Sequence, residues 1–148
     1  MCKQCLDVQQ MQHLQELGLK LKETMLYWVV YEVGHENSFV TTKENAMEVI
    51  DESCGMLPAY TLQDVLDALP SQVEFLIEMP SHLERNIYKL RIKKMFFDEG
   101  YVKYLVMYEK EYTLGWIALY SNEVLIDAAY DMLCWAIEYG KVATNKNE

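Results

Sequence analysis

Glycine and proline are scarce in this sequence, which has six and three of them in 148 residues. Their combined share is about half of the roughly 12% that is average for these two residues. This scarcity excludes a collagen-like chain or a flexible linker, and a hydrophobic share of 51% predicts a folded core. Because 148 residues is about the length of one domain, we expect a single domain over residues 1–140, followed by a polar tail over residues 141–148.

Long hydrophobic runs are also missing. The longest run near the front of the chain covers the seven residues 25–31, whereas a membrane-spanning helix needs about 20 apolar residues. The first five residues lead directly into a polar helical pattern, without the apolar segment of a secretory signal. We therefore expect a cytoplasmic protein that does not bind a membrane.

Cysteine is rare, and its four residues are too few for a disulfide scaffold. Cys2 and Cys5 have the C-x-x-C spacing that lets two thiolates bind one metal ion, but a structural zinc site needs two further ligands. Cys54 with His35 or His82 has the residue types of a thiol nucleophile. No nucleophile elbow, glycine-rich phosphate loop or His-Glu-x-x-His motif occurs. We expect reduced thiols, no cofactor and no enzyme activity; a metal-dependent or thiol enzyme using Cys2, Cys5 or Cys54 is the alternative.

Basic residues are in the minority, with 13 Lys and Arg against 23 Asp and Glu and a net charge of −10. Such a charge repels a phosphate backbone, so nucleic-acid binding is disfavoured, and an acidic mimic of nucleic acid is a further alternative function. Residues 85–110 depart from this balance, because they hold seven basic and three acidic residues. This separation indicates a basic interaction surface for an anionic partner or for self-association, or else a lysine-rich edge strand that blocks edge pairing. The candidate interaction residues in this segment are Lys89, Arg91, Lys93 and Lys94.

Three segments carry the end signals of helices. Asp7, with a glutamine three residues later, begins a short helix, and Thr61 begins a second one in the same manner. A long C-terminal helix follows Ser121 or Asn122 and stops at Gly140.

Strand patterns occupy much of the remaining chain. Residues 25–31 are rich in aromatic and β-branched residues on both alternating faces, which predicts a central strand, with a short partner at residues 39–41. Residues 43–57 are ambiguous and suggest a helical turn followed by irregular structure. Four further segments predict an antiparallel meander. They are residues 73–79, 88–93, 101–109 and 112–120.

The charge and hydrophobic patterns also predict how these strands pair. Setting Phe75 opposite residue 90 puts apolar on apolar and places Glu74 opposite Arg91. In the last two strands the even positions carry no charge, so we expect them, Trp116 included, to face the core. The whole pattern predicts a two-layer α+β fold with an antiparallel sheet of about five strands, a long C-terminal helix and two short helices.

Three segments in this order are similar to a group of small proteins of unknown function that are encoded by bacteria, prophages and other mobile elements. The segments are CLDVQQMQHLQELG (5–18), YTLQDVLDALP (60–70) and DAAYDMLCWAIEYG (127–140). Each is a helix with its caps, so the resemblance implies a shared fold and a mobile-element setting but no activity. This chain adds Cys2 and the stretch 43–56 to that pattern.

The last helix is apolar around more than half of its circumference, which is more than one sheet face can cover. Trp135 lies on this wide apolar arc, so we include it among the interaction residues. We expect a homodimer through this helix or through the aromatic sheet edge. The helix also carries an acidic stripe, which we interpret as a solvated face rather than a cation site: Glu123, Asp127 and Asp131. The sequence thus favours an intracellular protein-interaction or accessory protein.

Overall fold

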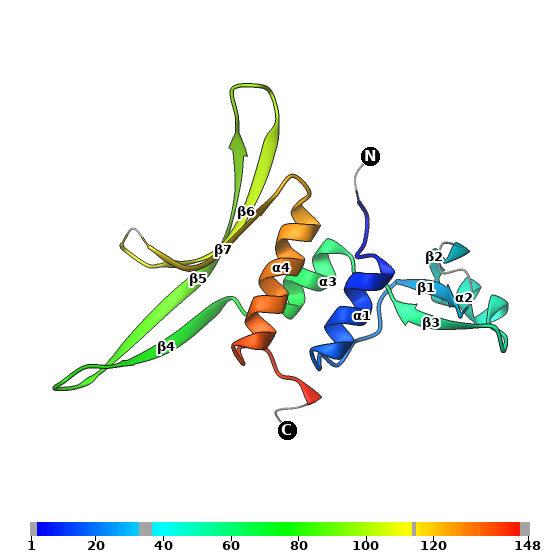
Figure 1. Ribbon diagram of the computed structural model, residues 1–148, viewed down its shortest axis with the longest axis horizontal. Helices are drawn as coiled ribbons and strands as arrows, with labels where there is room; N and C mark the ends of the chain where they lie inside the picture. The colour runs from blue at the N-terminus through cyan, green and yellow to red at the C-terminus, as the bar shows by residue number, and fades with distance from the viewer. Residues whose placement is uncertain (1–2, 33–36, 114, 146–148) are drawn as a thin grey trace.

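The computed structural model describes residues 3–32, 37–113 and 115–145. Four helices and seven strands lie in these ranges (Figure 1). The helices are α1 (Val8–Glu16), α2 (Lys43–Val49), α3 (Leu62–Ala68) and α4 (Leu125–Glu138). The strands are β1 (Leu26–Tyr31), β2 (Phe39–Thr42), β3 (Cys54–Pro58), β4 (Gln72–Glu78), β5 (Leu83–Phe96), β6 (Val102–Lys110) and β7 (Trp116–Asn122).

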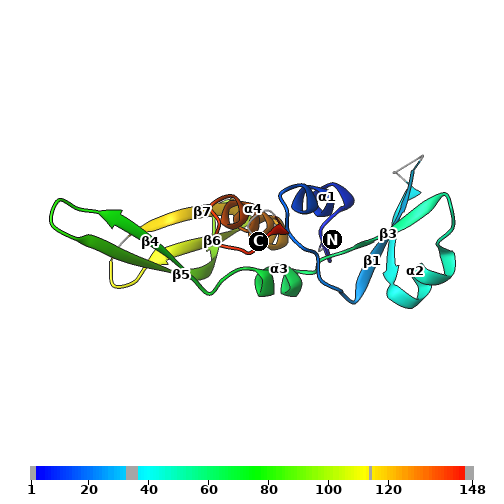
Figure 2. The same ribbon diagram turned by 90° about the horizontal axis from the view of Figure 1, so that it is seen from below.

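The strands form two separate antiparallel sheets. One has the order β2-β1-β3, and the other is a meander with the order β4-β5-β6-β7. Figure 2 shows the two sheets at opposite ends of the molecule, with α1, α3 and α4 between them. The α+β class, the four-stranded meander and the C-terminal helix are therefore confirmed.

The division into two sheets differs from the single sheet of about five strands that the sequence predicts. β1 is central in its sheet, as expected, because β2 and β3 pair with its two edges. α2 and all of β3 except its last residue come from residues 43–57, the ambiguous part of the sequence, and the Thr42 side chain caps α2. With both edges of β1 occupied, the meander has no edge of β1 to pair with and forms its own sheet.

Two of the three predicted helices, α1 and α3, begin at their predicted capping residues. Asp7 and Gln10 form a reciprocal capping box at α1, and Thr61 and Asp64 form one at α3. At α4 the expected cap at Ser121 or Asn122 is wrong, because the N-cap residue is Val124, which has no side-chain capping bond; the Asn122 side chain accepts a hydrogen bond from the Val124 N–H at 2.8 Å. α4 begins immediately after that residue.

The pairing of β4 with β5 differs from the predicted register by four residues. Phe75 lies opposite Asn86 instead of residue 90, because a tight turn joins the strands, in which the Met79 N–H donates to the His82 carbonyl at 2.8 Å. A shift by an even number leaves each side chain on its predicted face. Glu74 consequently forms its ion pair with Arg85, at 2.6 Å, and not with Arg91.

The even face of β6 and β7 is buried in its middle, whereas Val102, Tyr104 and Tyr120 are half-buried. Val106, Tyr108 and Ala118 are all buried. Tyr112, an even position that was expected to face the core, precedes β7 and is 96% exposed, so that expectation is wrong. A β-bulge after Tyr108 then changes the register, so that Trp116 lies opposite Glu109. Because opposite residues share a face, the bulge moves Trp116 to the outer side of the sheet, where it is 60% exposed. The expectation that Trp116 faces the core is therefore wrong.

The hydrophobic core is centred on α4, which packs against α3, β6 and β7. Eight of its fourteen residues are buried. The same cluster includes Leu14 of α1, Leu57 of β3 and Val73 of β4, so both sheets contribute to it. The single domain over residues 1–140 stays a prediction that unfolding measurements can test.

Residues 141–145 of the expected polar tail contact the rest of the chain. Lys141 Nζ donates to the backbone carbonyl of Glu74 at 2.6 Å and lies 4.1 Å from the ring centroid of Phe75. The Asn145 N–H donates to the carbonyl of Gly18 at 2.9 Å. None of the described helices is long and apolar enough to cross a membrane.

Candidate interaction surface

The long strand β5 carries two projecting hairpin arms, one at each end. Its 14 residues pair with β4 over 83–89 and with β6 over 88–96, so each end has a partner on one side only. We call residues 72–87 the acidic arm and residues 90–104 the basic arm. In Figure 1 the two arms extend in different directions from the centre of the meander, and both project beyond α4.

The tip of the basic arm is a short turn that the sequence specifies. The Phe97 N–H donates to the Tyr101 carbonyl and the Gly100 N–H donates to the Phe97 carbonyl, each at 3.0 Å. Gly100 has a φ of +83°, a left-handed conformation that glycine adopts without strain. A turn closed in this way is common in hairpins and places Phe97 and Tyr101 side by side.

Lysine side chains lie over aromatic rings on this arm. The rings of Phe97 and Tyr101 stack at a centroid distance of 4.8 Å, and Lys103 Nζ lies 5.9 Å from the Phe97 ring. Phe96 is 75% exposed, and Lys94 Nζ lies 5.3 Å from its ring centroid. Such cation–π contacts at exposed sites are worth about 0.5–1 kcal/mol each and hold the side chains in place without covering them.

Two of the four predicted basic residues are paired within the chain. Lys89 Nζ lies 2.9 Å from Glu111 Oε1, and Lys93 Nζ lies 3.3 Å from Glu109 Oε2. Both pairs link β5 to β6 or to the loop after it, so they neutralise the base of the basic arm.

Arg91 and Lys94 supply the remaining positive charge. Both side chains are exposed, and neither has an ion-pair partner among the described residues. The Arg91 side chain donates a hydrogen bond to the neighbouring carbonyl of Leu90, at 3.5 Å. The strand that carries the positive charge was therefore predicted from the sequence. The structure shows which of its basic residues form ion pairs, Lys89 and Lys93, and which do not among the described residues, Arg91 and Lys94.

Trp135 belongs to the core of the chain. Its ring lies 6.1 Å from Phe75, 5.7 Å from Tyr108 and 5.1 Å from Tyr139, centroid to centroid, and the residue is 9% exposed. The wide apolar arc of α4 is covered within the chain by α3 and two strands of the meander. We therefore leave Trp135 out of the interaction surface.

The acidic arm is the part of the surface that sequence reasoning missed. Leu76 and Leu83 near its free end are 64% and 62% exposed, and Ile77 and Met79 are 45% and 42% exposed. Leu76 could have indicated this surface, because alternation places this large apolar residue on the solvent-facing side of the strand, together with Glu74 and Glu78. Nine of the seventeen exposed large hydrophobic residues in the described chain lie on the two arms.

The described cysteines, Cys5, Cys54 and Cys134, are buried or half-buried. Burial raises the pKa of Cys5, and burial raises the pKa of Cys134 to about 11. The thiolate, which is the reactive form, is thus disfavoured in both. Cys54 is buried at the start of β3. Cys2 and His35 lie outside the described residues.

No group of three or more metal-binding side chains occurs within residues 3–32, 37–113 and 115–145.

One residue of the acidic stripe of α4, Asp127, has a structural role. Asp127 Oδ1 accepts hydrogen bonds from Lys3 Nζ at 2.7 Å and from Gln10 Nε2 at 2.9 Å. This contact ties the N-terminal segment and α1 to α4, so Asp127 is not part of a purely solvated face.

Asp127→Asn and Asp131→Asn are expected to change stability in opposite directions at pH 7. Burial raises the pKa of Asp127, but the hydrogen bonds from Lys3 and Gln10 outweigh it and the net pKa is lowered. Burial and the charge of Asp127 raise the pKa of Asp131. Asp127→Asn should therefore lower the free energy of unfolding by about 1 kcal/mol, and Asp131→Asn should increase it.

The pH dependence follows from the same signs. The contribution of Asp127 is present above its unfolded pKa and is lost as the pH falls through its lower folded pKa. The cost of ionised Asp131 is absent below its unfolded pKa and develops as the pH rises through its higher folded pKa. Urea unfolding measures the stability of both variants at pH 7 and at a pH below the folded and unfolded pKa of both aspartates. Equal effects of the two substitutions at pH 7 would contradict the expected difference between Asp127 and Asp131.

Comparison with protein-family models, with curated proteins and with solved structures gives no match for this chain.

Proposed function

We propose that this protein is a non-enzymatic binding protein that attaches to another protein through the basic arm. The observation that carries the proposal is the exposed cluster of Phe96, Phe97 and Tyr101 on a projecting two-stranded ribbon. A two-stranded hairpin with no helix on it is marginally stable in water. Exposed aromatic side chains on such an element are typical of interfaces, where Tyr, Phe and Arg are enriched.

The charges of the arm indicate the chemistry of its partner. The basic arm has four basic and two acidic residues, a net charge of +2 on a chain of −10. Its partner surface should therefore offer an apolar groove with carboxylates at the rim. Oppositely charged rims steer association and reject like-charged surfaces.

A protein partner is favoured over nucleic acid by the position of the acidic residues. Asp98 and Glu99 lie in the turn at the tip of the basic arm, where a ribbon entering a groove of DNA would meet phosphates. An acidic mimic of nucleic acid needs a continuous row of free carboxylates, and Asp127 in the middle of the α4 stripe is bound to Lys3. A thiol or metal enzyme would need ionised cysteines, whereas burial raises the pKa of Cys5.

The proposal extends to the setting and to self-association. We place the protein in the cytoplasm, as an accessory protein of a mobile element, in accordance with the resemblance of its three helical segments. A homodimer through the aromatic sheet edge is part of the proposal, because α4 is covered within the chain and the basic arm is not.

The variant Phe96→Ser with Tyr101→Ser tests the proposal. Because both side chains are exposed (75% and 42%), the melting temperature should stay within a few degrees of wild type. Loss of two aromatic contact residues should weaken partner binding by at least about tenfold. The measurement is quantitative affinity capture from cells that contain the protein, with an untagged copy expressed beside the tagged one.

Met25→Ser with Met47→Ser is the matched control, because these residues are 85% and 64% exposed and lie outside both arms. It removes exposed apolar surface of similar extent and should leave capture unchanged. Equal capture by wild type, control and arm variant, for every protein recovered and for the untagged copy, would refute the proposed function.

A further inference from the structure

We infer that the partner of the basic arm is a second copy of this chain, which binds it with the acidic arm. This inference rests on the proposed function, because it names the partner of the same arm. It follows from the complementary chemistry of the two arms and from their places at the two ends of β5.

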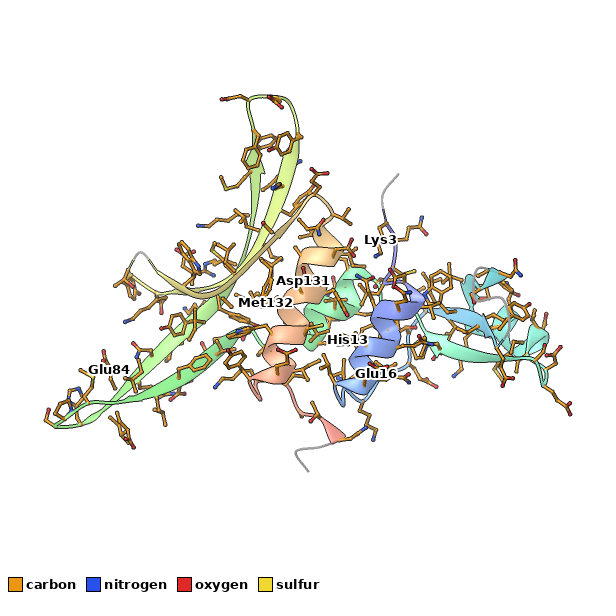
Figure 3. The ribbon with its side chains drawn as sticks, viewed as in Figure 1. Lys3, His13, Glu16, Glu84, Asp131 and Met132 are labelled. Carbon is orange, nitrogen blue, oxygen red and sulfur yellow. The ribbon has the colours of Figure 1, made fainter. Side chains whose placement is uncertain are left out.

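The acidic arm has the surface that the basic arm requires. It carries three acidic residues and one basic residue, a net charge of −2 against +2 for the basic arm. Glu74 and Arg85 pair with each other at 2.6 Å, so Glu78 and Glu84 provide the free negative charge. Neither of these two glutamates has an ion-pair partner in the described part of the chain. Figure 3 shows Glu84 toward the free end of this arm.

The apolar character of the arms is complementary too. Leu83 on the acidic arm lies opposite Glu78, which places exposed aliphatic carbon beside a carboxylate, while Leu76, which is also exposed, lies opposite Arg85. On the basic arm, Met95 lies opposite Lys103, which places exposed apolar surface beside an ammonium group. Each arm thus presents apolar contact area with a rim of charge opposite to that of the other arm.

In a two-fold symmetric dimer, the contact between an acidic arm and a basic arm forms twice. The acidic arm and the basic arm are built on opposite ends of β5, whose middle lies near Lys89. A two-fold axis close to this point brings the acidic arm of one copy to the basic arm of the other, and the reverse contact forms at the same time. Closed two-fold contacts of this kind, with the same patch on both subunits, are the commonest in homo-oligomers.

Pairing of the arms answers the objection that a chain of charge −10 should repel itself. At physiological salt, charges are screened beyond about 8 Å, so the charges within the contact dominate. The contact joins a +2 arm to a −2 arm. The lysines along residues 90–96 of β5 oppose strand-to-strand pairing of two like edges, so the contact forms between side chains on the faces of the arms.

A charge-exchange experiment tests this inference on the full-length chain. Arg91→Glu with Lys94→Glu converts the basic arm from +2 to −2, and Glu78→Lys with Glu84→Lys converts the acidic arm from −2 to +2. All four residues lack ion-pair partners among the described residues, so the variants should fold, which circular dichroism and melting temperature verify. The readout is sedimentation velocity over a concentration series.

The inference predicts that wild type forms a dimer and that each reversed variant alone dissociates at least about tenfold more readily. An equimolar mixture of the two variants should dimerise again, because each meets its opposite in the other. Glu48→Lys with Glu52→Lys, which changes two exposed glutamates outside both arms, should dimerise as wild type does. Raising the salt concentration should weaken the wild-type dimer.

Three results would overturn the inference. They are a wild-type chain that stays monomeric up to about 100 µM, a dimer that neither reversed variant weakens, and a mixture that does not restore association. A monomeric wild type whose Phe96→Ser, Tyr101→Ser variant still loses a different captured protein would reject the homodimer but leave the proposed binding of another protein through the basic arm intact. If the charge-reversed variants still associate and the Phe96→Ser, Tyr101→Ser variant is still captured with every partner, both the inference and the proposed function are rejected.

Discussion

Trp135→Ala should lower the free energy of unfolding by about 3–5 kcal/mol, the usual cost of removing a buried tryptophan ring. The ring fills the space between Phe75, Tyr108 and Tyr139, so its removal leaves a cavity as well as lost apolar burial. Urea denaturation followed by far-ultraviolet circular dichroism measures the change. A residue that served only as a contact for a partner would leave the stability of the single chain nearly unchanged.

Trp116→Ala is the matched control, because it removes the same side chain from a position that is 60% exposed. Its effect should stay within about 0.5 kcal/mol. Comparing Trp116→Ala with Trp135→Ala also tests whether the bulge after Tyr108 forms. If Trp116→Ala costs as much as Trp135→Ala, then Trp116 faces the core and the bulge after Tyr108 does not form.

Leu14→Ala should lower the free energy of unfolding by about 2–5 kcal/mol. Leu14 is fully buried on α1, in the cluster that contains Leu133 of α4 and Leu57 of β3. Because that cluster joins both sheets, the substitution should shift unfolding of the whole domain and not of α1 alone. Circular dichroism and the fluorescence of Trp135, with the other tryptophans replaced by phenylalanine, should report one coincident transition.

Gln15→Ala supplies the control for this substitution, because it changes an exposed residue of the same helix. It should leave the transition within about 0.5 kcal/mol of wild type. Two separated transitions, with Leu14→Ala moving only the first, would contradict the single domain over residues 1–140.

Local features of the fold could be predicted from the sequence because they depend on residues near each other in the chain. The capping boxes at Asp7 and Thr61 marked two helix starts, and alternation marked the strands of the meander. Short-range hydrogen bonds and side-chain periodicity determine these features, and both are visible in a single sequence.

Features that depend on distant parts of the chain were not predicted. The sequence could not show that β3 would occupy the second edge of β1. The β4–β5 register depended on the turn between Met79 and His82, and a shift of four keeps the same faces together, so hydrophobic pattern alone does not distinguish the two registers. The bulge after Tyr108 adds one residue to a strand and has no signal in the alternation.

The candidate surface was predicted in part for the same reason. The excess of positive charge around Arg91 and Lys94 can be counted in the sequence. Whether a charged strand lies at an edge, in a pair or on a projecting arm depends on how far its partners extend. β5 is longer than β4 and longer than β6, and it pairs with each of them over only part of its length, which creates the two arms.

Amide hydrogen exchange of the wild-type chain at low and high concentration tests most directly whether the two arms are a binding surface. Because dimerisation covers both arms, exchange within residues 72–87 and 90–104 should slow by about tenfold or more at high concentration, while the short and mostly exposed helix α2, which lies outside both arms, exchanges at the same rate in both samples. Arg91→Glu with Lys94→Glu should abolish that difference. Exchange in both arms that is equally fast at every concentration would contradict it.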